Sequence, residues 1–113
     1  MQVDGNTITM INGDSETITV SCIGIYGLPC DFDSGDTVYF TLKKTNSDIN
    51  SVPDLQKTIT VFQEGKAIIN LIPSDTINLS GGYEYDIEVK RLNGTVTTII
   101  KPSQFIINLG VTT

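Results

Sequence analysis

The sequence predicts an all-β fold: an immunoglobulin-like antiparallel β-sandwich of seven to eight strands. Three observations lead to this prediction. Apolar residues recur at every second position in several short segments, which is typical of half-buried strands. Residues that favour turns separate these segments at short intervals. Finally, Tyr83 opens one segment directly after a loop, as in the tyrosine corner of immunoglobulin-like sandwiches.

The first half of the chain contains three predicted strands, of which Thr17–Ile23 alternates most clearly. In order, the elements are a strand at Thr7–Ile11, a turn at Asn12–Asp14, a strand at Thr17–Ile23, a loop at Gly24–Asp36 and a strand at Thr37–Lys44. The period of two places one set of side chains in the core. This inward set comprises Ile18, Val20, Cys22, Val38, Phe40 and Leu42.

The second half begins with a polar segment and then returns to strands. The predicted elements are a flexible segment at Thr45–Asp54, strands at Leu55–Phe62 and Lys66–Ile72, a helical turn at Pro73–Thr76, a strand at Tyr83–Arg91, an Asn93-Gly94 turn and a strand at Thr95–Lys101. Ser74 or Asp75 is expected to cap the helical turn. Because proline cannot donate to a ladder, Pro102 is expected to break the last strand, which resumes at Gln104–Leu109 with Phe105, Ile107 and Leu109 facing the core.

The strand at Tyr83–Arg91 carries the predicted structural residues. Tyr83, Tyr85, Ile87 and Val89 face inward, while Glu84, Asp86, Glu88 and Lys90 face outward. We expect the Tyr83 hydroxyl to bond to backbone of the loop that contains Asp75, as in a tyrosine corner. Gly82 completes the turn into this strand. The structural set is therefore Tyr83, Tyr85, Asp75 and Gly82.

Composition bounds the architecture and excludes some functions. The chain has 113 residues, enough for one domain spanning 1–113. Its net charge is −6 and its seven basic residues are scattered, whereas nucleic-acid binding needs a clustered positive surface. The pairs Lys43-Lys44 and Lys90-Arg91 each end a predicted strand, so we interpret them as solubilising ends. No apolar run is long enough to span a membrane, and no secretory signal opens the sequence.

The two cysteines leave two interpretations open. Cys22 lies at an inward strand position, and Cys30 follows eight residues later in a loop. A disulfide would form in an oxidising compartment. Because the sequence shows no secretory signal, we expect instead a buried thiol at Cys22 and a loop thiol at Cys30.

Carboxylate clusters are the candidate chemical sites. Asp31, Asp33 and Asp36 crowd one loop and are weak candidates for binding calcium, but the further ligands of an EF-hand are missing. Aspartate before Ser34-Gly35 more simply stabilises a turn, so we expect no metal. Glu84, Asp86 and Glu88 alternate on one strand and are interpreted as a solvated face.

The sequence contains no histidine, so neither cysteine has the usual catalytic base. No phosphate-binding loop or cysteine cluster is present. We therefore expect no enzyme activity and no cofactor.

The sequence resembles the small immunoglobulin-like domains of tail and baseplate proteins in phages and prophages of Gram-positive bacteria, in particular the N-terminal domain of upper baseplate proteins. The matching segments are Ser34–Lys44, Leu55–Lys57, Glu64–Ala67, Leu71–Thr76, Gly82–Ile87 and Asn93–Thr98, ending at Phe105. The covered span is about Ser34 to Thr113. The sequence has no downstream helical or receptor-binding region, so it looks like an accessory structural protein or one excised domain.

The resemblance implies a non-enzymatic assembly module of the virion, made in the cytoplasm of the bacterial host. Its expected partners are other phage structural proteins, with a possible homo-oligomer in the particle and no nucleic acid or membrane. The alternative is a host-surface or carbohydrate-binding sandwich. Sugar sites need exposed aromatic rings, and the candidates outside the predicted core are Tyr26, Phe32, Tyr39 and Phe62.

Overall fold

The computed structural model describes residues 1–22, 31–45 and 51–110. In these residues the chain forms eight strands and one helical turn: β1 Gln2–Asp4, β2 Thr7–Ile11, β3 Glu16–Val20, β4 Thr37–Lys44, β5 Leu55–Ile59, β6 Ala67–Leu71, α1 Pro73–Thr76, β7 Gly81–Lys90 and β8 Val96–Asn108. None of the helical structure described is long and apolar enough to cross a membrane.

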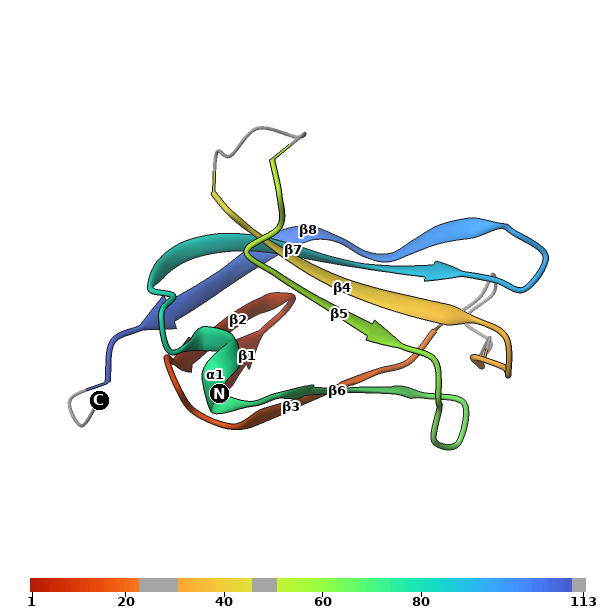
Figure 1. Cartoon of the computed structure of the whole chain (residues 1–113), viewed down its shortest axis with the longest axis horizontal. Helices are drawn as coiled ribbons and strands as arrows, with labels where there is room; N and C mark the ends of the chain where they lie inside the picture. Colours follow the sequence, from red (N-terminus) through yellow and green to blue (C-terminus); the bar gives the residue numbers. More distant parts are fainter. Residues whose placement is uncertain (23–30, 46–50, 111–113) are drawn as a thin grey trace.

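The strands form two sheets that face each other across one core (Figure 1). The larger sheet has the order β1-β2-β8-β7-β4-β5, and the smaller sheet pairs β3 with β6. The predicted all-β sandwich is therefore confirmed. One pair differs from the antiparallel prediction, because β2 runs parallel to β8, with Ile8 opposite Phe105. These two strands lie at opposite ends of the sequence, so no hairpin sets their relative direction.

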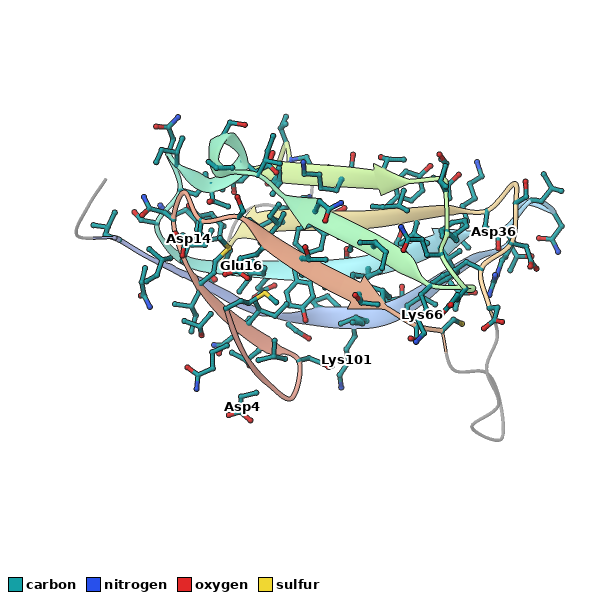
Figure 2. The ribbon with its side chains drawn as sticks, turned by 90° about the horizontal axis from the view of Figure 1, so that it is seen from below. Asp4, Asp14, Glu16, Asp36, Lys66 and Lys101 are labelled. Carbon is teal, nitrogen blue, oxygen red and sulfur yellow. The ribbon has the colours of Figure 1, made fainter. Side chains whose placement is uncertain are left out.

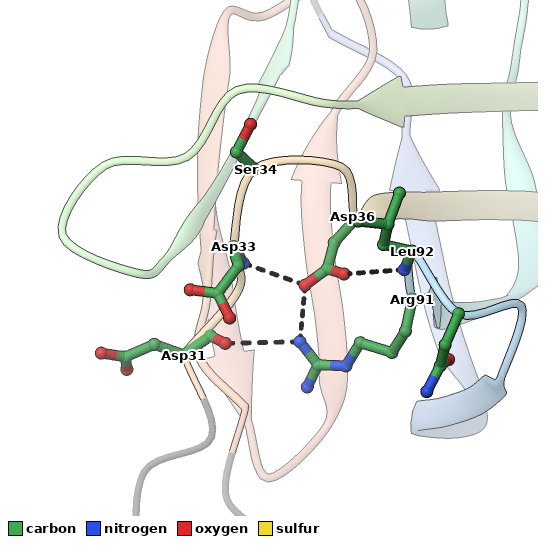
Figure 3. Close-up of a pocket in the computed structure, with 7 residues that line it drawn as sticks. Asp31, Asp33, Ser34, Asp36, Arg91 and Leu92 are labelled. Atoms are coloured by element: carbon green, nitrogen blue, oxygen red, sulfur yellow. Dashed lines mark hydrogen bonds and ion pairs between the residues drawn. The ribbon is translucent and has the colours of Figure 1, made fainter.

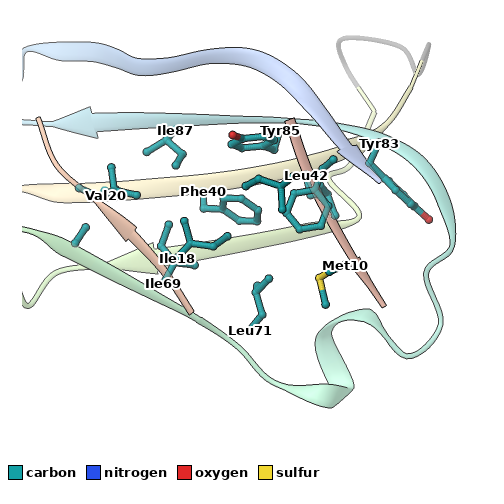
Figure 4. Close-up of a cluster of buried hydrophobic side chains, with 14 of the residues drawn as sticks. Met10, Ile18, Val20, Phe40, Leu42, Ile69, Leu71, Tyr83, Tyr85 and Ile87 are labelled. Carbon is teal, nitrogen blue, oxygen red and sulfur yellow. The ribbon is translucent and has the colours of Figure 1, made fainter. Parts of the chain in front are cut away.

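Aromatic rings and aliphatic side chains fill the core between the sheets (Figure 4). The rings of Phe40, Tyr85 and Phe105 pack with centroids 5.7–6.0 Å apart. Aliphatic side chains from the smaller sheet, including Ile18 and Ile69, are buried in the same cluster. The alternating residues predicted to face inward on β3, β4 and β7 are all buried. These positions follow from the period of two, since a shift by one residue would expose the whole set.

Two strands, β2 and β4, have the bounds that the sequence predicts. Three other strands are shorter than predicted, since β3 ends at Val20, β5 ends at Ile59 and β6 spans only Ala67–Leu71. Strand β1 was not predicted; it is three residues long, and all three residues are exposed. A strand this short has no recognisable alternation, and its pairing depends on the turn at Gly5, where φ is +60°.

The predicted break at Pro102 is wrong, because β8 continues through it as one strand. Ile100 lies opposite Ile87 and Ser103 lies opposite Tyr85, so β8 takes three steps where β7 takes two. Pro102 therefore sits in a bulge, where a missing N–H costs no ladder bond. Leu109 was also placed wrongly in the core: β8 ends at Asn108, and Leu109 is 70% exposed.

The helical turn α1 forms where it was predicted, but it is capped differently. The Ile72 backbone N–H donates to Asp75 Oδ2 at 2.9 Å, so Ile72 occupies the cap position and Asp75 acts from inside the first turn. Neither Ser74 nor Asp75 is the cap residue itself. The same Asp75 oxygen lies 2.7 Å from Lys57 Nζ. Asp75 thus fastens α1 to β5.

The two buried tyrosines of β7 each bond to a backbone group, one close in the sequence and one far away. Tyr83 Oη accepts the backbone N–H of Ser80 at 3.3 Å, a local contact within the preceding loop. Tyr85 Oη donates to the carbonyl oxygen of Asn6 at 2.6 Å, and burial raises the pKa of this phenol. Nearby, the Gly82 carbonyl accepts the N–H of Thr45 at 3.2 Å. Tyr85 therefore holds the β1–β2 turn, a role that the sequence analysis did not assign.

Replacing Tyr85 with phenylalanine is expected to destabilise the fold more than replacing Tyr83. Tyr85→Phe leaves the Asn6 carbonyl without its short bond, which should cost about 1 kcal/mol, and Tyr83→Phe should cost less because its bond is longer and local. Urea unfolding of the two variants beside the parent protein measures both costs. A larger loss in Tyr83→Phe would contradict this assignment.

Candidate functional site

An open hollow lies at one end of the sandwich, between the loop that precedes β4 and the hairpin that joins β7 to β8 (Figure 3). Its lining residues are Asp31, Asp33, Ser34, Asp36, Arg91, Leu92 and Asn93. The hairpin is closed by the backbone bond from Arg91 N–H to the Thr95 carbonyl, at 2.8 Å, and Gly94 turns the chain with φ of +91°. The hollow thus gathers the aspartates that the sequence analysis singled out.

Asp36 is the best-satisfied carboxylate of this cluster. Its Oδ2 accepts the Asp33 backbone N–H at 2.9 Å and Arg91 Nη1 at 2.7 Å, and its Oδ1 accepts the Leu92 backbone N–H at 3.3 Å (Figure 3). The side chain is only 5% exposed. The bond from the Asp33 N–H, followed by that from Arg91, holds the pKa of Asp36 below its usual range despite burial. Asp36 is therefore a buried, ionised anchor between loop and hairpin.

Arg91 spreads its contacts over the loop that it faces. Besides Asp36, it donates to the Asp31 carbonyl oxygen at 3.3 Å and to Cys22 Sγ at 3.7 Å. Its guanidinium also lies 5.5 Å from the centre of the Phe32 ring, within the range of a cation–π contact. The interpretation of Arg91 as a solubilising strand end is therefore wrong. Its main partner lies 55 residues earlier, and no local pattern in the sequence indicates such a pairing.

The three loop aspartates line the same hollow, but their side chains do not converge on one point. The Asp31 side chain packs against Gly65 so closely that a side chain at position 65 would collide with it. The backbone N–H of Phe32 donates to the Gly65 carbonyl at 3.0 Å. The Asp36 oxygens already accept three protein donors. In the described residues, no three His, Cys, Asp or Glu side chains converge on a point that could hold a metal ion. The expectation that this loop holds no metal stays a prediction.

The second acidic cluster lies on the outer face of the larger sheet. Glu84 is opposite Lys43, and Glu88 is opposite Tyr39 across the β4–β7 ladder. Burial, and then the nearby charge of Glu88, raise the pKa of Asp86, while Lys43 acts in the opposite sense. The sequence predicted a solvated face here, but Asp86 is half-buried. The charged neighbours of Asp86 on this face are Glu88 and Lys43.

Cys22 is disulfide-bonded and buried, so the expected free thiol is wrong. The other cysteine of the sequence, Cys30, lies outside the described residues. The expectation of a free thiol rested on the compartment of the protein, which does not determine the distance between two side chains. The bonded sulfur lies beneath Arg91, so the disulfide and the Asp36–Arg91 pair meet at the same end of the sandwich.

Neither a family model, a curated protein nor a solved structure matches this chain.

Removing the Arg91 guanidinium is expected to destabilise the domain by about 2–3 kcal/mol. Arg91→Met leaves the buried Asp36 carboxylate without its charged partner, and charge-assisted bonds of this kind are worth more than neutral ones. Arg91→Lys is the matched control. It keeps the positive charge but loses the planar guanidinium with its several N–H donors, so its loss of stability should be smaller. Thermal or urea unfolding measures both. Equal stability of Arg91→Met and the parent would contradict the anchoring role.

Asp36 also predicts a specific dependence on pH. Because its folded pKa is lowered, its contribution is fully present above the unfolded value of about 3.9 and is lost as the pH falls through the folded pKa. The parent should therefore be more stable than Asp36→Asn at neutral pH, and the difference should shrink below about pH 4. Unfolding curves from pH 7 downward measure this difference. A difference that stays constant with pH would show that the carboxylate charge is not involved.

Proposed function

We propose that this chain is an immunoglobulin-like assembly module of a phage or prophage tail or baseplate, which acts without catalysis by contacting other structural proteins of the particle. Its place of action would be the virion, after synthesis in the cytoplasm of the bacterial host. The resemblance over the span from Ser34 to Thr113 motivates the phage assignment. The strand order supports the immunoglobulin-like part: β3 pairs with β6, and β7 lies between β4 and β8. In immunoglobulin domains, strands B and E pair in the same way, and strand F lies between C and G.

The observation that supports a non-enzymatic role is that Asp36 and Arg91 bond to each other and to the protein backbone. Asp36 and Arg91 are oriented toward each other and toward backbone of the two loops that they join. A binding or catalytic pair would instead present a donor or acceptor to a ligand. Asp36 and Arg91 thus have a structural task, and the strand edges and faces remain as surfaces for contact.

The aromatic side chains support assembly over carbohydrate binding. Phe32 was a candidate for an exposed sugar-stacking ring, but it is 3% exposed and packs on Phe62, with 5.3 Å between ring centres. Phe62 itself is partly buried against the core. Tyr39 lies on the outer sheet face, and Tyr26 is outside the described residues. Of the described candidates, only Tyr39 is left outside the core, and a half-buried ring gives a sugar little stacking surface.

The particle itself tests this proposal. Phage or tail particles purified from a strain that expresses the protein should contain it at a fixed ratio to a known tail protein, as measured by quantitative mass spectrometry. An abundant cytoplasmic host protein, quantified in the same samples, controls for contamination. Consistent absence of the protein from particles, together with specific binding to a host glycan, would favour the carbohydrate-binding alternative instead.

A further inference from the structure

Most strand edges of this sandwich carry a feature that hinders pairing with another chain. On β5, Lys57 shares the inward face with Leu55 and Ile59, and an inward charge on an edge strand disfavours further pairing. Lys57 also bonds to Asp75, which follows β6, so the edges of β5 and β6 lie against each other. At the other end of the larger sheet, β1 is only three residues long.

The free part of β8 is hindered in a different way. β2 pairs only with the last part of β8, from Phe105 to Asn108. The preceding part, from Val96, contains Lys101, Pro102 and the register shifts opposite β7. Lysine, proline and bulges are the devices by which natural proteins protect an open edge. A partner strand would find an irregular ladder there.

On the outer edge of β3, the only such feature in the described residues is Glu16, an inward-facing charge at the start of the strand that is paired with the amino group of Met1. From Glu16 to Val20 the strand pairs with β6 in continuous register, without proline, lysine or bulge. Thr17 and Thr19 face outward, whereas Ile18 and Val20 face the core. Among the described residues, β3 pairs with no strand other than β6, so one edge of its backbone is open (Figure 2). A regular, open edge of β-branched residues is a template for strand addition.

Charge indicates the chemistry of a fitting strand. Asp14 and Glu16 lie at the start of β3, and Lys66 lies near its other end, since Ala67 is opposite Val20 (Figure 2). Glu16 is already paired with the amino group of Met1 at 3.0 Å. Asp14 is exposed and forms no ion pair with any described residue. An antiparallel strand would end beside Asp14, so a basic residue at its C-terminal end would be favoured.

We infer that the outer edge of β3 accepts an extended strand from another structural protein, antiparallel to β3. The strand alternates β-branched apolar and polar residues and carries a basic residue at its C-terminal end and an acidic one at its N-terminal end. This inference rests on the proposed assembly function and names the contact by which assembly occurs. Backbone bonds supply the attraction, and the end charges select the direction.

Two synthetic peptides of identical composition test the inference, acetyl-EVTVTVTK-amide and acetyl-KVTVTVTE-amide. The first should bind the full chain at least about threefold more tightly, as measured by fluorescence anisotropy of labelled peptide, because only it places lysine beside Asp14 when antiparallel. Hydrogen exchange should slow in Thr17–Val20 on binding. Asp14→Asn should reduce the preference between the two peptides. Absence of binding by the first peptide, or protection at β5 or β8 instead of β3, would overturn the inference.

Matched variants separate edge binding from unfolding. Thr17→Lys/Thr19→Lys places charges on the outward positions of β3 and should weaken peptide binding by about fivefold or more. Gln56→Lys/Thr58→Lys makes the same change on β5 and should leave binding unaltered. Melting temperatures show that both variants are folded. If the peptide fails to bind but the protein is recovered in particles, the β3 contact is wrong and the assembly function stands. If the peptide binds but the protein is absent from particles, the phage role is wrong and the β3 contact stands.

Discussion

The contact between Asp36 and Arg91 joins the loop before β4 to the β7–β8 hairpin, at an end of the sandwich beyond the strand pairing. A buried carboxylate is costly unless every lone pair finds a donor. Here the loop before β4 and the β7–β8 hairpin each supply a backbone N–H, and Arg91 supplies the charge. The two connections are therefore positioned by one side chain, and a change in either would leave the buried charge unsatisfied.

The same contact organises the neighbouring apolar groups. Arg91 covers the Phe32 ring, which in turn packs on Phe62, so the loop adds an aromatic pair at the rim of the core. The bonded sulfur of Cys22 lies under the same guanidinium. Charge, disulfide and aromatic packing thus act on one short region. Asp36 and Arg91, which lie in the hollow, therefore serve stability.

The two sheets differ in size, which has a consequence for those edges. Six strands face two, and in the part of the chain that the structure describes the outer side of β3 has no paired strand. Lys57, Pro102 and the bulges of β8 protect other edges, each by a different physical means. From Thr17 to Val20 the edge of β3 is regular and carries no charge, which fits a module that assembles by accepting a strand.

Sequence patterns predicted the parts of this fold that local rules determine. The strand β4 and the inward positions of β7 follow from alternation, and Asn93-Gly94 forms the expected hairpin. Local rules failed where partners are remote. The sequence could not show that Arg91 meets Asp36, that Tyr85 holds Asn6, or that β2 lies parallel to β8. Pro102 was misjudged because its effect depends on the register of the neighbouring strand.

A double-mutant cycle on Asp36 and Arg91 tests the central claim most directly. Unfolding free energies of the parent, Asp36→Asn, Arg91→Met and the double variant, all at neutral pH, give the coupling between the two side chains. If the pair anchors loop to hairpin, the double variant should lose at least about 1 kcal/mol less than the sum of the single losses. Losses that add to within about 0.5 kcal/mol would show that the two residues act independently and would contradict the account.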